Sequence, residues 1–287
     1  MTIDTCFHPI YFDMIQTSEA ELKKREEAFG VHKQSPYTMD EILSEMDYGK
    51  IEKSILHPIA LTTTENVSIV TNEEISKIIQ QEPNRFIGFA SVDPNNPEAE
   101  TELEQAFQKG LAGLTFHPGK QQIYPNDPKM KPLYQLCEKY DKPIYFHSGL
   151  SWEPRSYTKF CQPLFVEDVL IEHPALRICL AHFSWPWIQE VMMLMIKYSN
   201  LYTDTSMLYL NSFDDFFGDF FSNQLTPSTI ERNFPRQIMF GSNTPRFRAF
   251  KVKRALEKIP FSKEVRENIL TNNAYDYVYG RKSRHDL

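Results

Sequence analysis

The chain has 287 residues, of which 31 are basic and 38 acidic, so its formal net charge is −7. The sequence has no basic stripe of the kind that binds phosphate backbones, and we expect no nucleic-acid partner. It has no run of about 18 apolar residues, so we expect no membrane-spanning helix. The first residues lack the basic and apolar pattern of a signal peptide. The four cysteines are scattered without a CxxC pair, which is typical of reduced thiols in a cytoplasmic protein.

Short apolar runs typical of buried strands recur along the chain, and each is followed by a segment with helical spacing. The predicted strands are residues 3–7, 51–56, 85–92, 111–116, 143–146, 177–181, 201–203 and 237–240. The predicted helices after them include 39–49, 72–81, 97–109, 129–140, 163–172, 185–198, 246–258 and 263–277. Strands separated by helices pair in parallel through right-handed crossovers, and no hairpin is expected. Eight such units predict a single (β/α)₈ TIM barrel domain over residues 1–287.

Two segments do not follow the repeat. Residues 11–38 are polar and charged and form a predicted helical insertion after strand one, with an exposed helix predicted at 19–27. Barrels carry lids and substrate loops at that place. Residues 207–233 are rich in phenylalanine and are predicted to be irregular. Packing beside the barrel, a substrate lid and a subunit interface are the three interpretations of this segment, and the last is the basis for a possible homodimer.

Polar side chains stand at the end of each predicted strand. They are Cys6 and His8, His57, Asp93, His117, His147, His182, Asp204 and Asn243. The carboxyl ends of barrel strands carry the active site in enzymes of this fold. The sequence therefore places its candidate chemistry at one mouth of the barrel.

The spacing Cys6-x-His8 suits a metal site, because residues two apart in a strand point to the same face. A thiolate and an imidazole are both zinc ligands. His147 and His182 end two consecutive strands, and with the first pair they indicate one shared site. Asp204 is placed to orient a ligand histidine.

Several ordered motifs resemble a known family. They are Ile3-Asp4-Thr5-Cys6-Phe7-His8-Pro9, Gly113-Leu114-Thr115-Phe116-His117-Pro118, Pro143-Ile144-Tyr145-Phe146-His147-Ser148-Gly149, Ala181-His182-Phe183, Phe240-Gly241-Ser242-Asn243-Thr244-Pro245 and Asn273-Ala274. The chain resembles the amidohydrolase superfamily, in the amidohydrolase-related branch that includes aminocarboxymuconate-semialdehyde decarboxylase and benzoate-type decarboxylases. The resemblance extends from Ile3 to about Ala274.

The resemblance implies a metal-dependent hydrolase or decarboxylase that acts on a small carboxylated, cyclic or unsaturated substrate. It implies a divalent metal, with zinc as the first expectation, at the barrel mouth. The metal ligands would fall on Cys6, His8, His147 and Asn243. His182 and Asn243 would be the catalytic residues, with His182 polarising the substrate or relaying a proton.

Two residues depart from the family's pattern. Cys6 stands where the family has a histidine, and Asn243 stands where it has an aspartate. A thiolate binds zinc but adds negative charge, and an amide cannot act as a general base. Three alternatives stay open: a metal enzyme in which His182 takes over proton transfer, a metal-free enzyme with Cys6 as nucleophile, and a non-catalytic ligand-binding barrel with a degenerate metal site.

Further mouth residues are candidates for substrate binding. They are His57, His117, Trp152, Arg155, Trp185 and Arg246. An arginine there could hold a substrate carboxylate through two hydrogen bonds, and a tryptophan could cover an aromatic ring. A purely structural role is the alternative for each of them. The sequence does not distinguish hydrolysis from decarboxylation.

Overall fold

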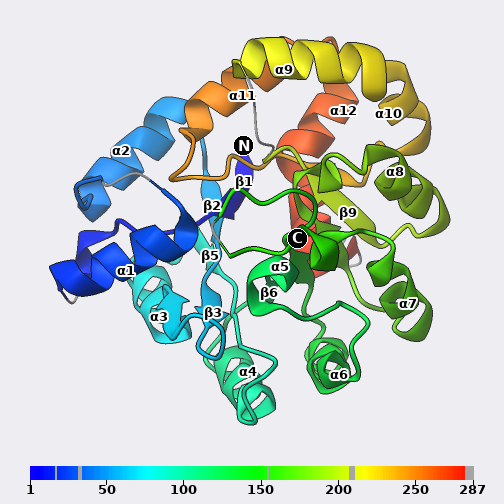
Figure 1. Cartoon of the computed structure of the whole chain (residues 1–287). Helices are drawn as coiled ribbons and strands as arrows, with labels where there is room; N and C mark the ends of the chain where they lie inside the picture. Colours follow the sequence, from blue (N-terminus) through cyan, green and yellow to red (C-terminus); the bar gives the residue numbers. More distant parts are fainter. Residues whose placement is uncertain (17, 32–33, 154, 207–210, 282–287) are drawn as a thin grey trace.

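The computed structural model of the chain describes all residues except 17, 32–33, 154, 207–210 and 282–287. Eight parallel strands of this described part form a ring with helices outside it (Figure 1). They are β1 (Ile3–Phe7), β2 (Lys53–Leu56), β5 (Phe86–Gly88), β6 (Leu114–Phe116), β7 (Ile144–Phe146), β8 (Ile178–Leu180), β9 (Leu201–Asp204) and β10 (Ile238–Met239). The predicted (β/α)₈ TIM barrel is confirmed.

The ring consists of a three-stranded sheet, β1-β2-β5, and a five-stranded sheet, β6-β7-β8-β9-β10. Two isolated parallel bridges, Phe7 with Thr244 and Ala90 with Leu114, join the sheets. The amide of Thr5 also donates to the carbonyl of Phe240 over 2.9 Å. These contacts close the barrel between its first and last strands.

Helices follow the strands as expected for this fold. They are α1 (Glu19–Phe29), α2 (Met39–Gly49), α3 (Asn72–Gln81), α4 (Ala99–Gln108), α5 (Pro118–Gln121), α6 (Lys131–Lys139), α7 (Phe165–Glu172), α8 (Ile188–Lys197), α9 (Phe213–Asp219), α10 (Pro227–Asn233), α11 (Ala249–Glu257), α12 (Lys263–Glu267) and α13 (Asn273–Tyr279). Short helical turns are η1 (Asp13–Ile15), η2 (Pro128–Met130), η3 (Thr158–Cys161), η4 (Ala181–Ser184), η5 (Phe220–Gln224) and η6 (Asn268–Asn272).

Two details of the predicted secondary structure are wrong. The segment predicted to be irregular contains α9, η5 and α10, since Ser212 and Thr226 cap the two helices with their hydroxyl groups. Its first residues, 207–210, lie outside the described part. After β2 the chain also forms an antiparallel hairpin of β3 (Ile59–Leu61) and β4 (Val67–Ile69), which the sequence pattern did not indicate because both strands have only three residues.

Apolar side chains fill the barrel interior and the end of the barrel at which the strands begin. The interior group includes Ile55 and Met239 from the strands and Phe89 directly after β5, together with Ala274 and Tyr277 from α13. Helix α13 therefore closes the amino-terminal end of the barrel. Polar chemistry is left to the opposite end, the carboxyl ends of the strands.

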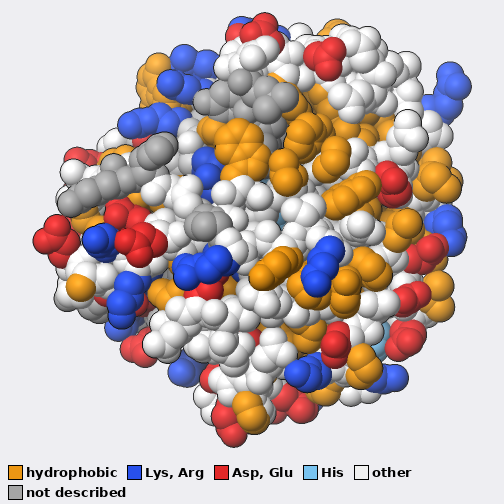
Figure 2. All heavy atoms as spheres, in the orientation of Figure 1, with side chains coloured by type: hydrophobic (Ala, Val, Ile, Leu, Met, Phe, Trp, Pro, Cys, Tyr) orange, Lys and Arg blue, Asp and Glu red, His pale blue; other side chains and the backbone are white. Residues whose placement is uncertain are grey.

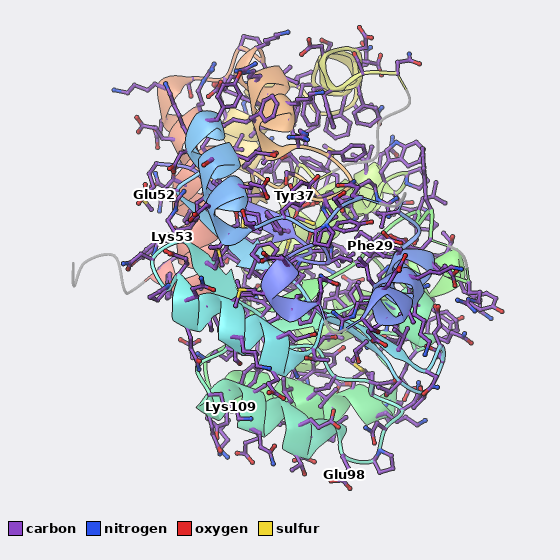
Figure 3. The ribbon with its side chains drawn as sticks, turned by 90° about the vertical axis from the view of Figure 1, so that its left-hand side faces the viewer. Phe29, Tyr37, Glu52, Lys53, Glu98 and Lys109 are labelled. Atoms are coloured by element: carbon purple, nitrogen blue, oxygen red, sulfur yellow. The ribbon has the colours of Figure 1, made fainter. Side chains whose placement is uncertain are left out.

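Helix α1 covers part of that opposite end. Figure 3 shows Phe29, the last residue of α1, on the far side of the barrel from Glu52 and Lys53 at the start of β2. Ser18 caps the helix, and Gly30 ends it in a left-handed conformation with φ 65°. Buried Arg25 of α1 forms an ion pair of 2.9 Å with Glu74 of α3, which fixes the helix against the barrel.

Candidate active site

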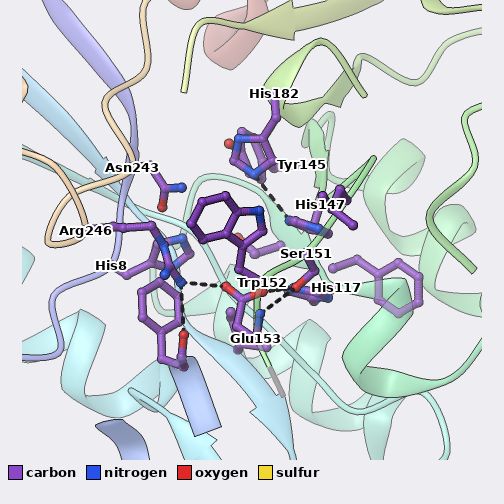
Figure 4. A pocket seen from close by; sticks show the side chains of 15 residues that line it. His8, His117, Tyr145, His147, Ser151, Trp152, Glu153, His182, Asn243 and Arg246 are labelled. Carbon is purple, nitrogen blue, oxygen red and sulfur yellow. Dashed lines mark hydrogen bonds and ion pairs between the residues drawn. The ribbon is translucent and has the colours of Figure 1, made fainter. Parts of the chain in front are cut away.

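A pocket opens at the carboxyl ends of the strands (Figure 4). Its lining includes His8, His117, His147, Trp152, His182, Asn243 and Arg246, all predicted site residues. These side chains come from the ends of β1, β6, β7, β8 and β10 and from the loop after β7. The fold thus brings together seven of the predicted residues, widely separated in sequence, around one cavity.

Asp204, at the end of β9, organises the floor of the pocket. One of its carboxylate oxygens accepts from the backbone amides of His182 (3.0 Å) and Ser206 (3.2 Å) and from the Ser206 hydroxyl (2.5 Å). The other accepts from the Tyr145 hydroxyl (2.7 Å) and the Thr5 hydroxyl (3.3 Å). Asp204 is fully buried, and this number of donors to one carboxylate fixes the groups around it.

A chain of hydrogen bonds runs from Ser206 to His147. His182 Nδ1 lies against the backbone carbonyl oxygen of Ser206, and its Nε2 is 3.2 Å from His147 Nδ1. A carbonyl oxygen only accepts, so His182 carries its proton on Nδ1 and accepts on Nε2 from His147. His147 Nε2 is then left with a free lone pair. That atom is buried, and the described part of the chain offers it no hydrogen-bond partner.

His8 presents a second lone pair. Its Nδ1 is 3.0 Å from the backbone carbonyl oxygen of His57 and therefore donates to it. Its Nε2 faces the Cys6 sulfur at 3.9 Å. Burial lowers the pKa of His8 well below its usual value, and burial likewise lowers the pKa of His147. Both imidazoles are neutral and able to act as ligands or bases.

The backbone is strained at the two predicted catalytic positions. His182, Phe183 and Ser184 have φ values of 61°, 48° and 49°, and Asn243 has 62°. Residues other than glycine seldom adopt this left-handed backbone conformation, and such strain is concentrated at functional sites. Asparagine tolerates it better than most residues. The turn after β8 directs His182 toward the pocket, and Asn243 lies opposite, beside Arg246 (Figure 4).

One wall of the pocket holds an ion pair. Arg246 Nη2 donates to one carboxylate oxygen of Glu153 at 2.9 Å, and His117 Nε2 lies 3.9 Å from the other. His117 accepts at Nδ1 from the Lys120 amide (3.3 Å), so its proton is on Nε2 and faces Glu153. This wall therefore binds the carboxylate of Glu153, and the imidazole of His147 lies directly beside it.

Cys6, His8 and His147 have donor atoms of the kind that bind a divalent metal. Two ligands of one zinc ion are typically about 3.6 Å apart, close to the 3.9 Å between Cys6 Sγ and His8 Nε2. The free Nε2 of His147 and the anchored Nδ1–H groups of both histidines are further features of ligand histidines. In the described residues, however, ligand atoms of Cys6, His8 and His147 do not all lie within 4.8 Å of one another.

A different trio does meet that limit: His117, His147 and Cys161. The rings of His117 and His147 stack at 4.0 Å with planes only 9° apart. Imidazole lone pairs lie in the ring plane, so two stacked rings cannot direct them to one ion. His117 also uses its only lone pair to accept from Lys120. The chemistry of the donors therefore favours Cys6, His8 and His147 over this trio, although Cys6 is fully buried and does not line the pocket.

Three predicted substrate-binding residues lie outside the pocket lining. His57 is fully buried below it, with Nδ1 2.7 Å from the Thr115 hydroxyl and Nε2 2.8 Å from the Thr5 carbonyl oxygen. Arg155 is exposed and forms an ion pair of 2.7 Å with Glu65. Trp185 is partly buried and packs on the core. The structure gives each of these three a structural partner instead of a place in the cavity.

Sequence reasoning did not select two important residues. Tyr145 lies in β7, two positions before His147. Because side chains two residues apart in a strand point to the same face, the sequence could have identified Tyr145 as a neighbour of His147. Glu153 lies in an irregular loop between two residues that were selected, and no periodicity marks it. Its role depends on Arg246, 93 residues away, which only the fold brings near.

Comparison with known families places the chain. A family model described as "Amidohydrolase" matches residues 58–279, more than half of the chain. The chain belongs to this amidohydrolase family and is an enzyme. The predicted family resemblance is thereby confirmed. No curated protein sequence shows a significant match to the chain.

Solved structures share the fold. An uncharacterized TIM-barrel protein from Bordetella bronchiseptica matches with a TM-score of 0.77 and 19% identity, covering 97% of this chain and 98% of that one. A 2,6-dihydroxybenzoate decarboxylase from Rhizobium matches with a TM-score of 0.63 and 18% identity, covering 96% and 98%. A 5-carboxyvanillate decarboxylase from Novosphingobium aromaticivorans, complexed with manganese and 4-hydroxy-3-methoxy-5-nitrobenzoic acid, matches at 0.61 and 15%, covering 97% and 96%.

Proposed function

We propose that this enzyme acts on a small aromatic or otherwise unsaturated carboxylate, by decarboxylation or hydrolysis, with a divalent metal held by Cys6, His8, His147 and Asn243. The observation that carries the proposal is that imidazole lone pairs and N–H donors lie side by side in one pocket. His147 Nε2 has no hydrogen-bond partner in the described residues, and His8 Nε2 faces the Cys6 thiol. Arg246 and His117, whose ring stacks on that of His147, present N–H donors next to them. A carboxylate held by these donors therefore lies beside the two imidazoles. The similar decarboxylases act on substrates of this kind.

The residues have separate roles in this proposal. A metal bound there supplies Lewis acidity, and zinc fits the sulfur and imidazole donors best. Asn243 contributes at most a neutral amide oxygen and cannot exchange a proton. Burial lowers the pKa of His182, and the adjacent Asp204 charge opposes that shift. His182 is the proton carrier next to the pocket, because it lines the cavity and its Nε2 faces His147. To reach the substrate it must give up the hydrogen bond from His147, and until then it positions that ligand.

The geometry disfavours Cys6 as a nucleophile. The thiol is fully buried among the apolar side chains of the barrel interior. Burial and the nearby Asp204 charge raise its pKa well above the usual value, so the reactive thiolate is not populated at neutral pH. Metal binding is the circumstance that would favour the thiolate, because a metal ion replaces the thiol proton.

The first experiment is metal analysis of untagged protein. We expect about one divalent metal ion per chain in the wild type. Cys6→Ala and His147→Ala should lose it. Cys179→Ala is the matched control, since Cys179 is also fully buried in the barrel interior but is not a predicted ligand. Protein without metal after incubation with zinc, and indifferent to chelators, would contradict the proposal. A screen of carboxylated aromatic, lactone and amide substrates by CO₂ release and by pH change then separates decarboxylation from hydrolysis.

Three coarser predictions accompany the proposal. The chain forms one domain, works in the cytoplasm and assembles as a homodimer. All four cysteines are unpaired and buried, which supports a reducing compartment. No helix in the described part of the chain is long and apolar enough to cross a membrane. Light scattering at micromolar concentration tests the dimer, and a monomer mass would contradict it.

A further inference from the structure

Glu153 places a carboxylate inside the pocket. Its side chain is only 10% exposed, and Arg246, at 13%, forms a 2.9 Å ion pair with it. The hydroxyl of Ser151 donates to the oxygen that faces His117. Burial raises the pKa of Glu153, but His117 and Arg246 outweigh burial and hold that pKa well below its usual range. The group is therefore an anion at neutral pH.

The donors that receive this anion are held by other parts of the fold. Arg246 also donates to the backbone carbonyl oxygens of Phe29 (3.0 Å) and Gly30 (3.2 Å), and its guanidinium lies 5.1 Å from the Phe29 ring centre. His117 is held by its stacking on His147 and by the Lys120 amide. The anion-binding wall would therefore persist if the Glu153 side chain moved out.

Glu153 and its neighbours also fill the space that a substrate needs. Ser151, Trp152 and Glu153 all belong to the pocket lining, and Figure 4 shows Trp152 between the Asn243 and His147 sides. The free volume that remains is about 30 Å³. A cavity that binds benzene has a volume of about 150 Å³, so a cyclic carboxylate does not fit beside Glu153. Figure 2 shows the same end of the barrel with hydrophobic side chains grouped around its centre.

We propose that Glu153 is a resident carboxylate in the position of the substrate's carboxylate, which a carboxylated ligand must displace from Arg246 and His117. This inference rests on the proposed function and adds a selection step to it. A ligand with a carboxylate restores both contacts when Glu153 leaves, whereas a neutral analogue leaves Arg246 buried without a counter-ion. Glu153 thereby lowers the affinity for every ligand and rejects uncharged ones most strongly.

The test uses the full chain, Glu153→Gln and isothermal titration with benzoate, with benzamide as the uncharged probe of the same shape. We expect Glu153→Gln to bind benzoate at least tenfold more tightly than the wild type, because the amide competes weakly for a guanidinium. Benzamide should bind neither protein more tightly than benzoate does. Glu138→Gln is the matched control. That carboxylate also contacts a histidine, His173, at 2.9 Å but lies outside the pocket, so its loss should leave the benzoate affinity unchanged.

The alternative outcomes separate the inference from the proposed function. Benzoate affinity that is unchanged or weaker in both Glu153→Gln and Glu153→Ala, with circular dichroism like that of the wild type, overturns the resident-carboxylate role. If Arg246→Gln then still abolishes benzoate binding, the carboxylate-binding wall of the proposed function stands alone. If no variant binds benzoate, both fall. A lower kcat in Glu153→Gln with unchanged benzoate affinity would mean that Glu153 transfers protons, which also contradicts the inference.

Discussion

Asp204 shows how one residue can fix a site without touching a substrate. Its two carboxylate oxygens collect donors from β1, β7 and the turn after β8, and Asp204 itself ends β9. We predict that Asp204→Asn lowers kcat/KM by roughly 10–100-fold, because the amide cannot accept from all these donors and His182 loses its orientation. The unfolding free energy should fall by about 1–3 kcal/mol. Steady-state kinetics and urea unfolding measure the two effects.

Asp93→Asn is the control for that variant. Asp93 also follows a barrel strand and is almost fully buried, but it accepts from Thr62, Thr63 and Asn95 outside the pocket lining. It should lose comparable stability and keep the wild-type kcat/KM. Equal loss of activity in both variants would mean that Asp204 acts only through general stability.

The residue scale is also where sequence reasoning reached its limit. The strand-end rule selected His8, His147 and Asn243, because position at the end of a strand can be read from apolar periodicity. It also selected His57, which the structure places below the pocket with both ring nitrogens bonded to the protein. The rule cannot resolve how deep a side chain lies. Glu153 could not be predicted from the sequence, because its partners come from other loops.

At the scale of elements, the loop after β7 depends on Gly149. This residue has φ 96°, and a Cβ there would lie 2.4 Å from the backbone oxygen of Trp185. Gly149→Ala should therefore destabilise the protein by about 2–5 kcal/mol, through strain and crowding together. Urea unfolding measures the change.

Gly110 separates the two causes. Its φ is 95°, yet an added Cβ would meet nothing within 4 Å. Gly110→Ala carries the backbone strain alone and should cost about 1–2 kcal/mol. Equal losses at both glycines would show that crowding against Trp185 is unimportant. A larger loss at Gly149 would place the loop root, and with it Glu153, under a steric constraint.

Helices α1 and α3 depend on one glutamate. Glu74 completes the capping box of α3 with Thr71 and also pairs with buried Arg25 of α1. Glu74→Ala should lower the unfolding free energy by about 2–4 kcal/mol, since it removes a cap and leaves a buried cation with a weaker partner. The neighbouring Glu73 is 75% exposed and pairs only along the helix with Lys77, so Glu73→Ala should stay within about 0.5 kcal/mol of the wild type. Similar melting temperatures for the two variants would contradict this account.

For the whole molecule, buried histidines set the response to acid. Burial is the main cause that lowers the pKa values of His8, His57, His147 and His182, to about 3 for His57. The unfolded chain binds protons at these groups near pH 6.5 and the folded chain does not, so their stabilisation is present above pH 6.5 and is lost as the pH falls. Burial raises the pKa of Asp4 to about 7, and its contribution has the opposite sign.

The four histidines destabilise the folded chain as the pH falls, and Asp4 alone has the opposite effect. The net result is a loss of stability between pH 6.5 and pH 4. We expect the melting temperature to fall steadily over this range when followed by circular dichroism. His57→Gln should reduce the slope of that fall, whatever its effect on the melting temperature at pH 7. His57 faces Thr5, Thr115, Tyr145 and Phe89, with His8 and His182 as its titratable neighbours besides Tyr145. A constant melting temperature between pH 4 and 6.5 would contradict the prediction.

The architecture itself was predictable from the sequence because eight apolar runs alternate with helical segments, and parallel pairing admits few topologies. The β3–β4 hairpin was not, because Ile59–Leu61 and Val67–Ile69 are too short to produce a period. Helix α9 was hidden by its three phenylalanines, Phe213, Phe216 and Phe217, and α10 by its short length of seven residues. Phe217, Phe220 and Phe221 are buried against the core, and they are therefore unavailable as the dimer surface that the sequence suggested.

The bond network between β1 and β10 also constrains the order of events when the chain folds. The Thr5 hydroxyl reaches the Phe240 carbonyl across 235 residues, and the Ser242 hydroxyl reaches Asp4 across 238. During synthesis, β1 can pair with β2 early, but its other edge has no partner until β10 has been made. Contacts of such long range form slowly, and an unpaired edge invites association with other chains. Ring closure is thus the late event that removes the edge on which nascent copies of this protein would aggregate.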